Sequence, residues 1–357
     1  MSDAAAGRHG RSRPDACSVL WDDTQGSALG TAPAAMFWLA LEQNGPWGSR
    51  AASQSHLDPD LGAAVDRMCQ DAGGRFILIR RPGTHSEPRE GNIQKVHTQK
   101  VHTQRVHTQA VHTPAVHTQR VYLAAGLGGG PASPPWLLQA DLDDPRRLTR
   151  LPMDSLRSGD IEAVRDALPE LELSPGPVLM ICTNSKRDVC CSVRGRPVAI
   201  ESASQRPGQV WECSHTGGHR FAPTGVLLPH GQALGRLSGT SAVAALDAAL
   251  RADLPAELLG ATHDRGRSHL AAPAQAAESI VRQQIQEPSL LALSTTAIPG
   301  PDPESPESRW HCRVSHVDGR HWDVVAVRGP SGDALPQSCG KEPLPRWHWS
   351  VVSDYGR

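Results

Sequence analysis

The order of apolar and polar residues predicts a chain that mixes strands with helices. Short apolar runs bounded by Gly, Pro or polar residues are typical of buried strands, and apolar residues three or four positions apart are typical of helices. Residues 34–48 are apolar and bounded by turns, and their periodicity fits a strand or a helix equally well. The runs predicted as strands are residues 75–83, 121–124, 136–144, 177–181 and 209–212. The segments predicted as helices are residues 59–74, 158–168, 198–205, 241–254 and 275–286.

Two hairpins complete this pattern and lead to the predicted fold class. Residues 225–237 hold two apolar runs around Pro229-His230-Gly231, and residues 310–329 hold two runs around Asp318-Gly319, a strong turn signal. We therefore expect an α/β (α+β) fold. Its predicted parts are a disordered tail (1–16), an N-terminal α/β domain (17–170), a second α/β domain (171–285), a Pro-rich linker (286–308) and a C-terminal β-hairpin tail (309–357).

A pentapeptide repeat interrupts the N-terminal domain at residues 96–120, as VHTQK, VHTQR, VHTQA, VHTPA and VHTQR. It carries five of the seventeen histidines, and histidine-rich tracts can bind metal. However, a period of five does not gather the histidines on one side of a helix or of a strand, and repeats this short and few cannot bury a core. We interpret the repeat as a disordered or loose surface loop, with a pentapeptide β-helical coil and a functional histidine tract as alternatives.

Composition and charge exclude several classes of protein. The formal net charge of -1 gives no reason to expect binding to nucleic acid or to an anionic membrane. No apolar run is long enough for a transmembrane helix, and residues 1–18 lack the apolar region of a secretory signal. We therefore expect a cytoplasmic protein, in which the cysteines are ligands or buried thiols rather than disulfides.

Residues 182–228 concentrate sulfur and imidazole side chains. The stretch begins where the strand predicted at 177–181 ends, and it continues through a polar loop, a helix and the strand predicted at 209–212. Thiolates and imidazoles together suit zinc or an iron–sulfur cluster, and they suit calcium or magnesium poorly. The candidate donors are Cys182, Cys190, Cys191, Cys213, His215 and His219.

The spacing of these donors favours a site with two thiolates and two imidazoles. Seven or eight residues separate Cys182 from the Cys190-Cys191 pair, a wider gap than the two to four residues usual in zinc fingers. A wide gap fits a binuclear cluster, in which one iron takes both thiolates and the other takes both imidazoles. Gly217-Gly218 between the histidines favours a tight loop over a helix. Rieske sequences interleave cysteine and histidine, and this chain does not.

The same stretch resembles the sucrase/ferredoxin-like family, a group of ferredoxins with a thioredoxin-like fold. The resemblance is carried by CTNSKRDVCC, GRPVA and VWECSHTGGHRFAPTGVLLPHGQALGR, with weaker similarity in LGTAPAAMFWLALEQNGPWG, HVDGRHWDVVAV and SCGK. It implies a [2Fe-2S] cluster held by C-x8-C and H-x3-H, which fall on Cys182, Cys191, His215 and His219. Cys190 is the alternative to Cys191 as a ligand. A free cysteine is often a small buried apolar residue, and we interpret Cys190 and Cys213 in this way.

The resemblance also implies a function. Residues 171–285 are expected to form a thioredoxin-like [2Fe-2S] domain, and the predicted order of strand, helix, strand, loop, hairpin and helix agrees with that fold. We expect electron transfer, coupled to protons through the histidines, with an unidentified redox partner protein. The alternative is a zinc-stabilised binding module with the same four ligands. We expect a non-enzymatic electron carrier rather than an enzyme, because the chain has neither a C-x-x-C motif for thiol redox chemistry nor a convincing pair of carboxylates for hydrolysis.

If His215 and His219 bind the outer iron, the reduction potential should depend on pH. Each imidazole ligand keeps a second ring nitrogen, which holds its proton more tightly when the iron is reduced because the metal's charge acts on the ring. The midpoint potential should then fall by about 59 mV per pH unit for each coupled proton. Redox titrations between about pH 6 and pH 10 on the wild type and on His219→Cys check this. A flat wild-type curve would exclude titrating histidine ligands, and an unchanged slope in the variant would exclude His219 as their source.

Overall fold

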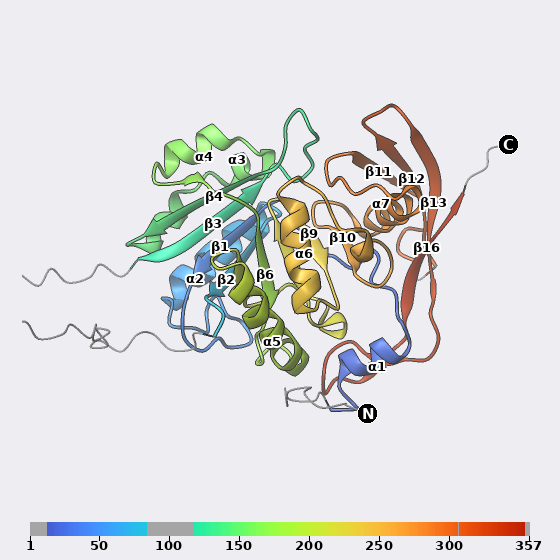
Figure 1. Ribbon diagram of the computed structural model, residues 1–357, viewed down its shortest axis with the longest axis horizontal. Coiled ribbons are helices and arrows are strands. Elements are labelled where there is room, and N and C mark those ends of the chain that lie inside the picture. The colour runs from blue at the N-terminus through green and yellow to red at the C-terminus, as the bar shows by residue number, and fades with distance from the viewer. Residues whose placement is uncertain (1–12, 84–117, 306, 354–357) are drawn as a thin grey trace, which may run out of the picture.

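The computed structural model of the protein describes residues 13–83, 118–305 and 307–353 (Figure 1). It combines helices with several sheets, which confirms the predicted α/β (α+β) class. Residues 1–12 of the predicted tail and residues 96–117 of the pentapeptide repeat lie outside the described residues. None of the helices in the described ranges is long and apolar enough to cross a membrane.

Helices and strands alternate along the first two thirds of the chain, and strands dominate the last part. The first part of the chain forms α1 (Cys17–Asp23), β1 (Trp38–Glu42), α2 (Pro59–Asp71), β2 (Arg75–Arg80), β3 (Gln119–Ala125), β4 (Trp136–Leu142), the 3-10 helix η1 (Pro145–Arg150), α3 (Met153–Ser158), α4 (Ile161–Ala167) and β5 (Glu172–Leu173). The middle forms β6 (Val178–Cys182), α5 (Val189–Gln205), β7 (Val210–Cys213), η2 (His219–Phe221), β8 (Gly225–Leu228), β9 (Gln232–Leu234), α6 (Gly239–Ala249), η3 (Ala256–Leu258), β10 (Asp264–Arg267) and α7 (Ala272–Ile285). The last part forms β11 (Leu293–Pro299), β12 (Arg309–His316), β13 (His321–Pro330), β14 (Leu335–Pro336), β15 (Pro343–Leu344) and β16 (Trp347–Ser353).

Within the described residues, one mixed sheet of ten strands has the order β10-β9-β8-β6-β7-β2-β1-β3-β4-β5. Two parts of it share one connectivity. In the first, β1 and β2 are parallel with α2 between them, β3 pairs antiparallel with β1, and β4 pairs antiparallel with β3. In the second, β6 and β7 are parallel with α5 between them, β8 pairs antiparallel with β6, and β9 pairs antiparallel with β8. The thioredoxin-like detail of the expected fold stays a prediction.

The two parts of the sheet meet where β2 and β7 pair antiparallel. Ile79 lies opposite Cys213 and Arg80 lies opposite Glu212. Both members of the second pair are buried, and they form an ion pair at 2.8 Å. The regions predicted as two domains therefore share one continuous sheet, while the domain boundaries themselves stay a prediction.

Both faces of this sheet are apolar, which explains the near-continuous apolar runs of its central strands. Alternate residues of β1 and β2 pack with α2, α3 and α4, and alternate residues of β6 and β8 pack with α5 and α6. The remaining alternate residues of these strands point to the other face of the sheet. They form a third cluster, which includes Ile79 and Cys213 from the junction. The central strands, on which the candidate site is built, are thus held by packing on both faces.

Helix α5 begins at Val189, whereas the sequence pattern indicated a helix over residues 198–205 that is started by Pro197. Asp188 is its N-cap, and the Asp188 carboxylate accepts the N–H of Cys190 at 2.8 Å. Such a cap stabilises the first helical turn, and Pro197 is accommodated inside the helix. Gly195 has no side chain to collide with the carbonyl oxygen of Cys182, so the helix packs closely on β6. The first turn of α5, rather than a loop, therefore carries Cys190 and its neighbour Cys191.

The C-terminal region is more extensive than the predicted linker and hairpin. Strands β12 and β13 form the expected hairpin, but β11 and β16 extend it to the four-stranded antiparallel sheet β11-β12-β13-β16. Residues 293–299 of the predicted linker are strand β11, whose first residue, Leu293, is buried against α7. Trp310 and Trp322 pack on the same core, as expected. This sheet covers α7 on the side away from the large sheet (Figure 1).

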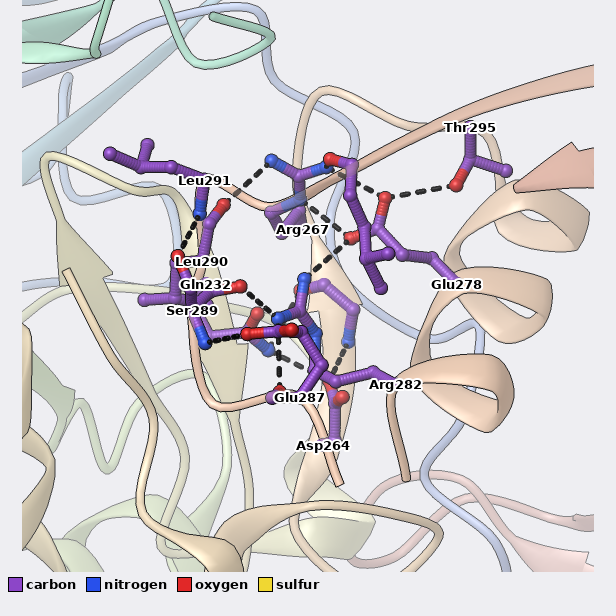
Figure 2. A network of polar contacts seen from close by, with 12 residues as sticks. Gln232, Asp264, Arg267, Glu278, Arg282, Glu287, Ser289, Leu290, Leu291 and Thr295 are labelled. Atoms are coloured by element: carbon purple, nitrogen blue, oxygen red, sulfur yellow. Dashed lines mark hydrogen bonds and ion pairs between the residues drawn. The ribbon is translucent and has the colours of Figure 1, made fainter. Parts of the chain in front are cut away.

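A buried ion network joins the two sheets through α7 (Figure 2). Glu278 on α7 accepts two hydrogen bonds of 2.7 Å from the guanidinium of Arg267 on β10 and one of 3.3 Å from Arg282. Thr295 on β11 donates to the same carboxylate at 3.0 Å. The three ionic side chains are at most 3% exposed, and both guanidinium groups also donate to backbone carbonyls. One carboxylate thus connects β10, α7 and β11.

Replacing Glu278 by glutamine should lower the free energy of unfolding by about 3–5 kcal/mol at pH 7, because two buried guanidinium groups lose their counter-charge. Burial alone would raise the pKa of Glu278, but Arg267 and Arg282 lower it to about 2. An unfolded glutamate titrates at about 4.3, so the wild-type contribution is complete above that pH and is lost as the pH falls toward 2. Urea unfolding of the wild type and the variant at pH 7 and at about pH 3 measures both effects.

The matched control for this experiment is Glu257→Gln, which removes an exposed acid on η3. We expect it to change the free energy of unfolding by less than about 0.5 kcal/mol. An effect of Glu278→Gln no larger than that of the control would contradict the role assigned to the network.

Candidate metal centres

The predicted ligands gather at the edge of the sheet where β6 and β7 end and α5 begins. Cys182 is the last residue of β6, and Cys191 lies in the first turn of α5. Because β6 and β7 are parallel, their C-terminal ends meet at the same edge, and the loop after β7 carries His215 and His219 to it. We refer to these four residues as the Cys182–His219 group. The structure brings all four together.

Contacts link the four side chains. The Sγ atom of Cys191 lies 3.1 Å from Nδ1 of His219. The rings of His215 and His219 are stacked, with centroids 5.1 Å apart and planes inclined by 30°. A hydrogen bond between the two thiols lowers the pKa of Cys182 and raises that of Cys191, and the His215 imidazole lowers the pKa of Cys182 further. Cys182 is therefore the thiol of the group that ionises more readily, whereas Cys191 keeps its proton until a metal ion replaces it.

The sulfur and imidazole sides of this group differ in exposure. Cys182 and Cys191 are both 0% exposed, whereas His215 and His219 are half-buried. Burial lowers the pKa of His219, which keeps its ring neutral and available as a ligand at neutral pH. The group is thus covered at its thiols and open at its histidines.

The histidine loop is shaped by two glycines, as predicted. Gly217 and Gly218 have φ angles of 69° and 71°, a region that favours glycine. Arg265 on β10 is 1% exposed and donates to the carbonyl of Gly217 at 3.1 Å and to that of Thr216 at 3.4 Å. A Cβ atom on Gly218 would meet this guanidinium. The loop is therefore folded against a buried cation.

Arg265 stays positively charged in this position. Burial lowers its pKa to about 9 and the charge of Arg220 acts in the same direction, whereas negative charge on Cys182, or on Cys191 once it has lost its proton, acts in the opposite one. The guanidinium is therefore protonated at neutral pH, close enough to the two thiols for their charges to interact.

A second group of metal-binding side chains lies beside the first turn of α5. The donor atoms of Cys17, Asp188, Cys190 and Cys339 all lie within 4.8 Å of one another. Cys17 begins α1, Asp188 and Cys190 begin α5, and Cys339 lies between β14 and β15. We refer to these four as the Cys17–Cys339 group. A hydrogen bond from the Cys17 thiol lowers the pKa of Cys190.

Sequence reasoning missed this second group because its members are far apart in the chain. Cys190 is 173 residues from Cys17 and 149 residues from Cys339. Local spacing rules connect neighbouring cysteines and carry no information on such pairs. The sole signal was the resemblance of the segment SCGK, which contains Cys339, to the same family as the central motif.

The adjacent cysteines of α5 belong to different groups. Successive helical residues point about 100° apart, so Cys191 faces His219 while Cys190 faces the thiols of Cys17 and Cys339. Cys190 is buried, as interpreted, but it has polar contacts that this interpretation did not include. Cys213 is buried in the core cluster that contains Cys182, as expected. The described residues include all eight cysteines, and each is a free thiol.

Comparison with known proteins gives one match. A family model described as Sucrase/ferredoxin-like matches residues 28–257, a range that holds the whole Cys182–His219 group but neither Cys17 nor Cys339. No curated protein and no solved structure matches the chain. Because the matched range is more than half of the 357 residues and includes the motifs on which the resemblance depends, the protein belongs to the sucrase/ferredoxin-like family.

Proposed function

We propose that the protein is an electron carrier whose [2Fe-2S] cluster is bound by Cys182, Cys191, His215 and His219. The observation that carries this proposal is the convergence of two thiols and two imidazoles from β6, α5 and the histidine loop at one edge of the sheet. The family description, sucrase/ferredoxin-like, supports it because it includes ferredoxins.

The donor set fits such a cluster. When bound, a [2Fe-2S] cluster supplies one-electron transfer, and thiolate and imidazole are both ligands that these clusters use. Cys182 has a lowered pKa and can ligate as the thiolate, and the neutral ring of His219 can ligate without losing a proton. Covered thiols and half-exposed imidazoles keep the sulfur side dry and leave the histidine side near solvent.

Arg265 supports redox chemistry from inside the fold. Its buried charge interacts with those of Cys182 and Cys191. An added electron makes the site more negative, so a fixed cation nearby favours the reduced state. Arg265 therefore raises the reduction potential, and burial strengthens its effect because little water screens it.

We place the contact with the redox partner protein at a hollow beside His215. The hollow has a volume of about 600 Å³, and His215 is the member of the Cys182–His219 group that lines it. Its charged lining consists of four arginines and one aspartate, so the hollow is positively charged and suits an acidic surface on the partner. The charged residues are Arg50, Asp66, Arg67, Arg75 and Arg187.

The alternative is a zinc-stabilised binding module that uses the same four ligands. In zinc fingers both thiolates usually come from one tight turn, with two to four residues between the cysteines. In this protein the two cysteines come from a strand and a helix, both imidazoles are partly exposed, and His215 lines a cationic hollow. These features favour electron exchange over a purely structural role.

Cys191→Ser should abolish or shift the visible absorption of the protein and lower its iron content, because a ligand of the inner iron is lost. Cys213→Ser is the matched control, since Cys213 is equally buried at the same edge of the sheet and is not a proposed ligand. Iron analysis and visible spectra of both variants provide the measurement. A colourless wild type that holds zinc on two sulfur and two nitrogen ligands would favour the alternative function. Loss of iron in Cys190→Ser together with retention in Cys191→Ser would move the ligand by one residue.

Arg265→Gln should lower the midpoint potential by about 50–100 mV, the effect of removing one unit charge several ångströms away at an effective dielectric constant of about 20. Arg265→Lys keeps the charge and should stay close to the wild type. Arg206→Gln, at the far end of α5, is the control for removal of an arginine distant from the site. Redox titration of the three variants measures the shift, and a potential in Arg265→Gln equal to that of the control would refute the role of Arg265.

A further inference from the structure

We propose that Cys17, Asp188, Cys190 and Cys339 form a second metal site that binds one Zn²⁺. This site is separate from the Cys182–His219 group and goes beyond the proposed electron transfer, because its formation requires no iron. Three thiols and one carboxylate are a donor set for a borderline-soft divalent cation, and zinc is the usual occupant of such thiolate-rich tetrahedral sites.

The distances between donor atoms suit a tetrahedral zinc ion. The Sγ atoms of Cys17 and Cys190 are 3.5 Å apart, those of Cys190 and Cys339 are 3.2 Å apart, and those of Cys17 and Cys339 are 3.6 Å apart. Sulfur ligands at about 2.3 Å from a tetrahedral centre lie about 3.8 Å from one another, so shifts of a few tenths of an ångström admit the ion. The oxygens of Asp188 lie 3.8 and 3.9 Å from the Sγ atom of Cys17, within reach of the same centre.

A disulfide explains this arrangement less well than a metal. Two bonded sulfurs are about 2.05 Å apart, and a disulfide would join two of the three thiols and leave the third unused. The near-equal separations among all three sulfurs indicate a common centre rather than a pair.

Asp188 is fixed in a position to act as the fourth ligand. Its Oδ2 atom accepts the hydroxyl of Ser338 at 2.6 Å and the N–H of Cys339 at 2.9 Å, while Oδ1 accepts the N–H of Cys190 at 2.8 Å. Because Oδ2 already accepts two hydrogen bonds, Oδ1 has the lone pair that remains for a metal. The same carboxylate orders the backbone of two of the three cysteines, so the site is pre-aligned.

Two buried groups beside the thiols favour negative charge on sulfur. Ser18, which is 0% exposed, hydrogen-bonds to Cys190 and lowers the pKa of its thiol. The Nε atom of Arg220 is buried without a hydrogen-bond partner within the described part of the chain, and the charge of this guanidinium favours an ionised Cys17. Neutral thiols are weak acceptors, but metal-bound thiolates accept hydrogen bonds and attract cations. A zinc-bound state therefore suits both groups.

An ion can reach this site from solvent. A surface hollow of about 330 Å³ is lined by Arg13, Val189, Cys190, Cys339 and their neighbours. Cys339, which is half-buried, and the more deeply buried Cys190 line the hollow, whereas Cys17 is fully buried and is not part of the lining. Binding would replace the thiol protons, which leave to solvent, by one Zn²⁺.

The site would fasten helix α1 and the segment between β14 and β15 to α5. Helix α1 lies next to the C-terminal segment that carries β14 (Figure 1), and Trp21 donates to the carbonyl of Pro336 at 3.0 Å. Asp22 of the same helix accepts a hydrogen bond of 2.7 Å from Arg236. Metal–ligand bonds to zinc would add to these contacts and hold the first turn of α5 in place.

The test uses the full chain, purified without chelators and exposed to Zn²⁺ before removal of free metal. Elemental analysis should find about one zinc per chain, and X-ray absorption at the zinc edge should find three sulfurs at about 2.3 Å and one oxygen. In Cys339→Ser the zinc content should fall at least about tenfold, and Cys17→Ser should give the same loss. Cys312→Ser, which changes a buried thiol on β12 outside the group, is the matched control and should keep its zinc.

Three results would overturn the proposal. These are a wild type that takes up no zinc, zinc retained in both Cys17→Ser and Cys339→Ser, and a Cys190–Cys339 disulfide found in the native protein by peptide mapping. Zinc with two sulfur and two nitrogen ligands would place the ion in the Cys182–His219 group, and would contradict the electron-carrier function as well. Absence of zinc together with an intact red-brown chromophore would refute this site alone.

Discussion

Both cysteine groups depend on the carboxylate of Asp188, because it fixes the residue at which helix α5 begins. By accepting the N–H of Cys190, it begins α5 at Val189, directly beside the end of β6. This start decides that Cys191 faces the histidines and that Cys190 faces α1. Had the helix begun after Pro197, both thiols would lie in a loop with no direction fixed by helical geometry. The second oxygen of the same carboxylate also orders the segment around Cys339.

The backbone around this point favours negative charge. The N-terminus of α5 carries a partial positive charge, which stabilises thiolates in its first turn. Arg265, which contacts the histidine loop, adds a full charge that burial shields from solvent. Gly195 allows the helix to lie against the end of β6. These positive charges favour the thiolate of Cys182, whose pKa is lowered, whereas the hydrogen bond from Cys182 and burial raise the pKa of Cys191, which keeps its proton until a metal ion replaces it.

Local sequence patterns predicted most elements, and the family resemblance supplied the four residues of the Cys182–His219 group. Apolar runs located β2 and β6, Asp160 capped α4 within the predicted helix, and the double glycine indicated the histidine loop. The predicted start of α5 was wrong because the chain offers two residues that can begin a helix, Asp188 and Pro197. The helix begins at the first of them, where the Asp188 carboxylate accepts the N–H of Cys190. Strand β11 was missed because most of its residues beyond Leu293 are exposed and its polar and apolar residues do not alternate.

Contacts between distant parts of the chain left no local signal. The junction of β2 with β7 has just two residue pairs, and each strand alone looks like any buried strand. Likewise, nothing near Cys17 or Cys339 indicates the other. The known structure explains such contacts in physical terms, since a buried ion pair of Arg80 and Glu212 closes the junction. The sequence alone does not indicate which of the many possible strand pairs will form.

The two cysteine groups differ in when they can form during synthesis. The members of the Cys182–His219 group lie in one short stretch, so they are all present once residue 219 has left the ribosome. Cys17 and Cys339 are 322 residues apart, and no nascent chain holds all donors of their group until residue 339 has been made. A chain truncated before that residue can therefore complete the first group while the second stays unassembled. The meeting of Cys17, Cys190 and Cys339 thus marks a chain that has been made at least as far as residue 339, and in which helix α1 and the segment between β14 and β15 have reached α5.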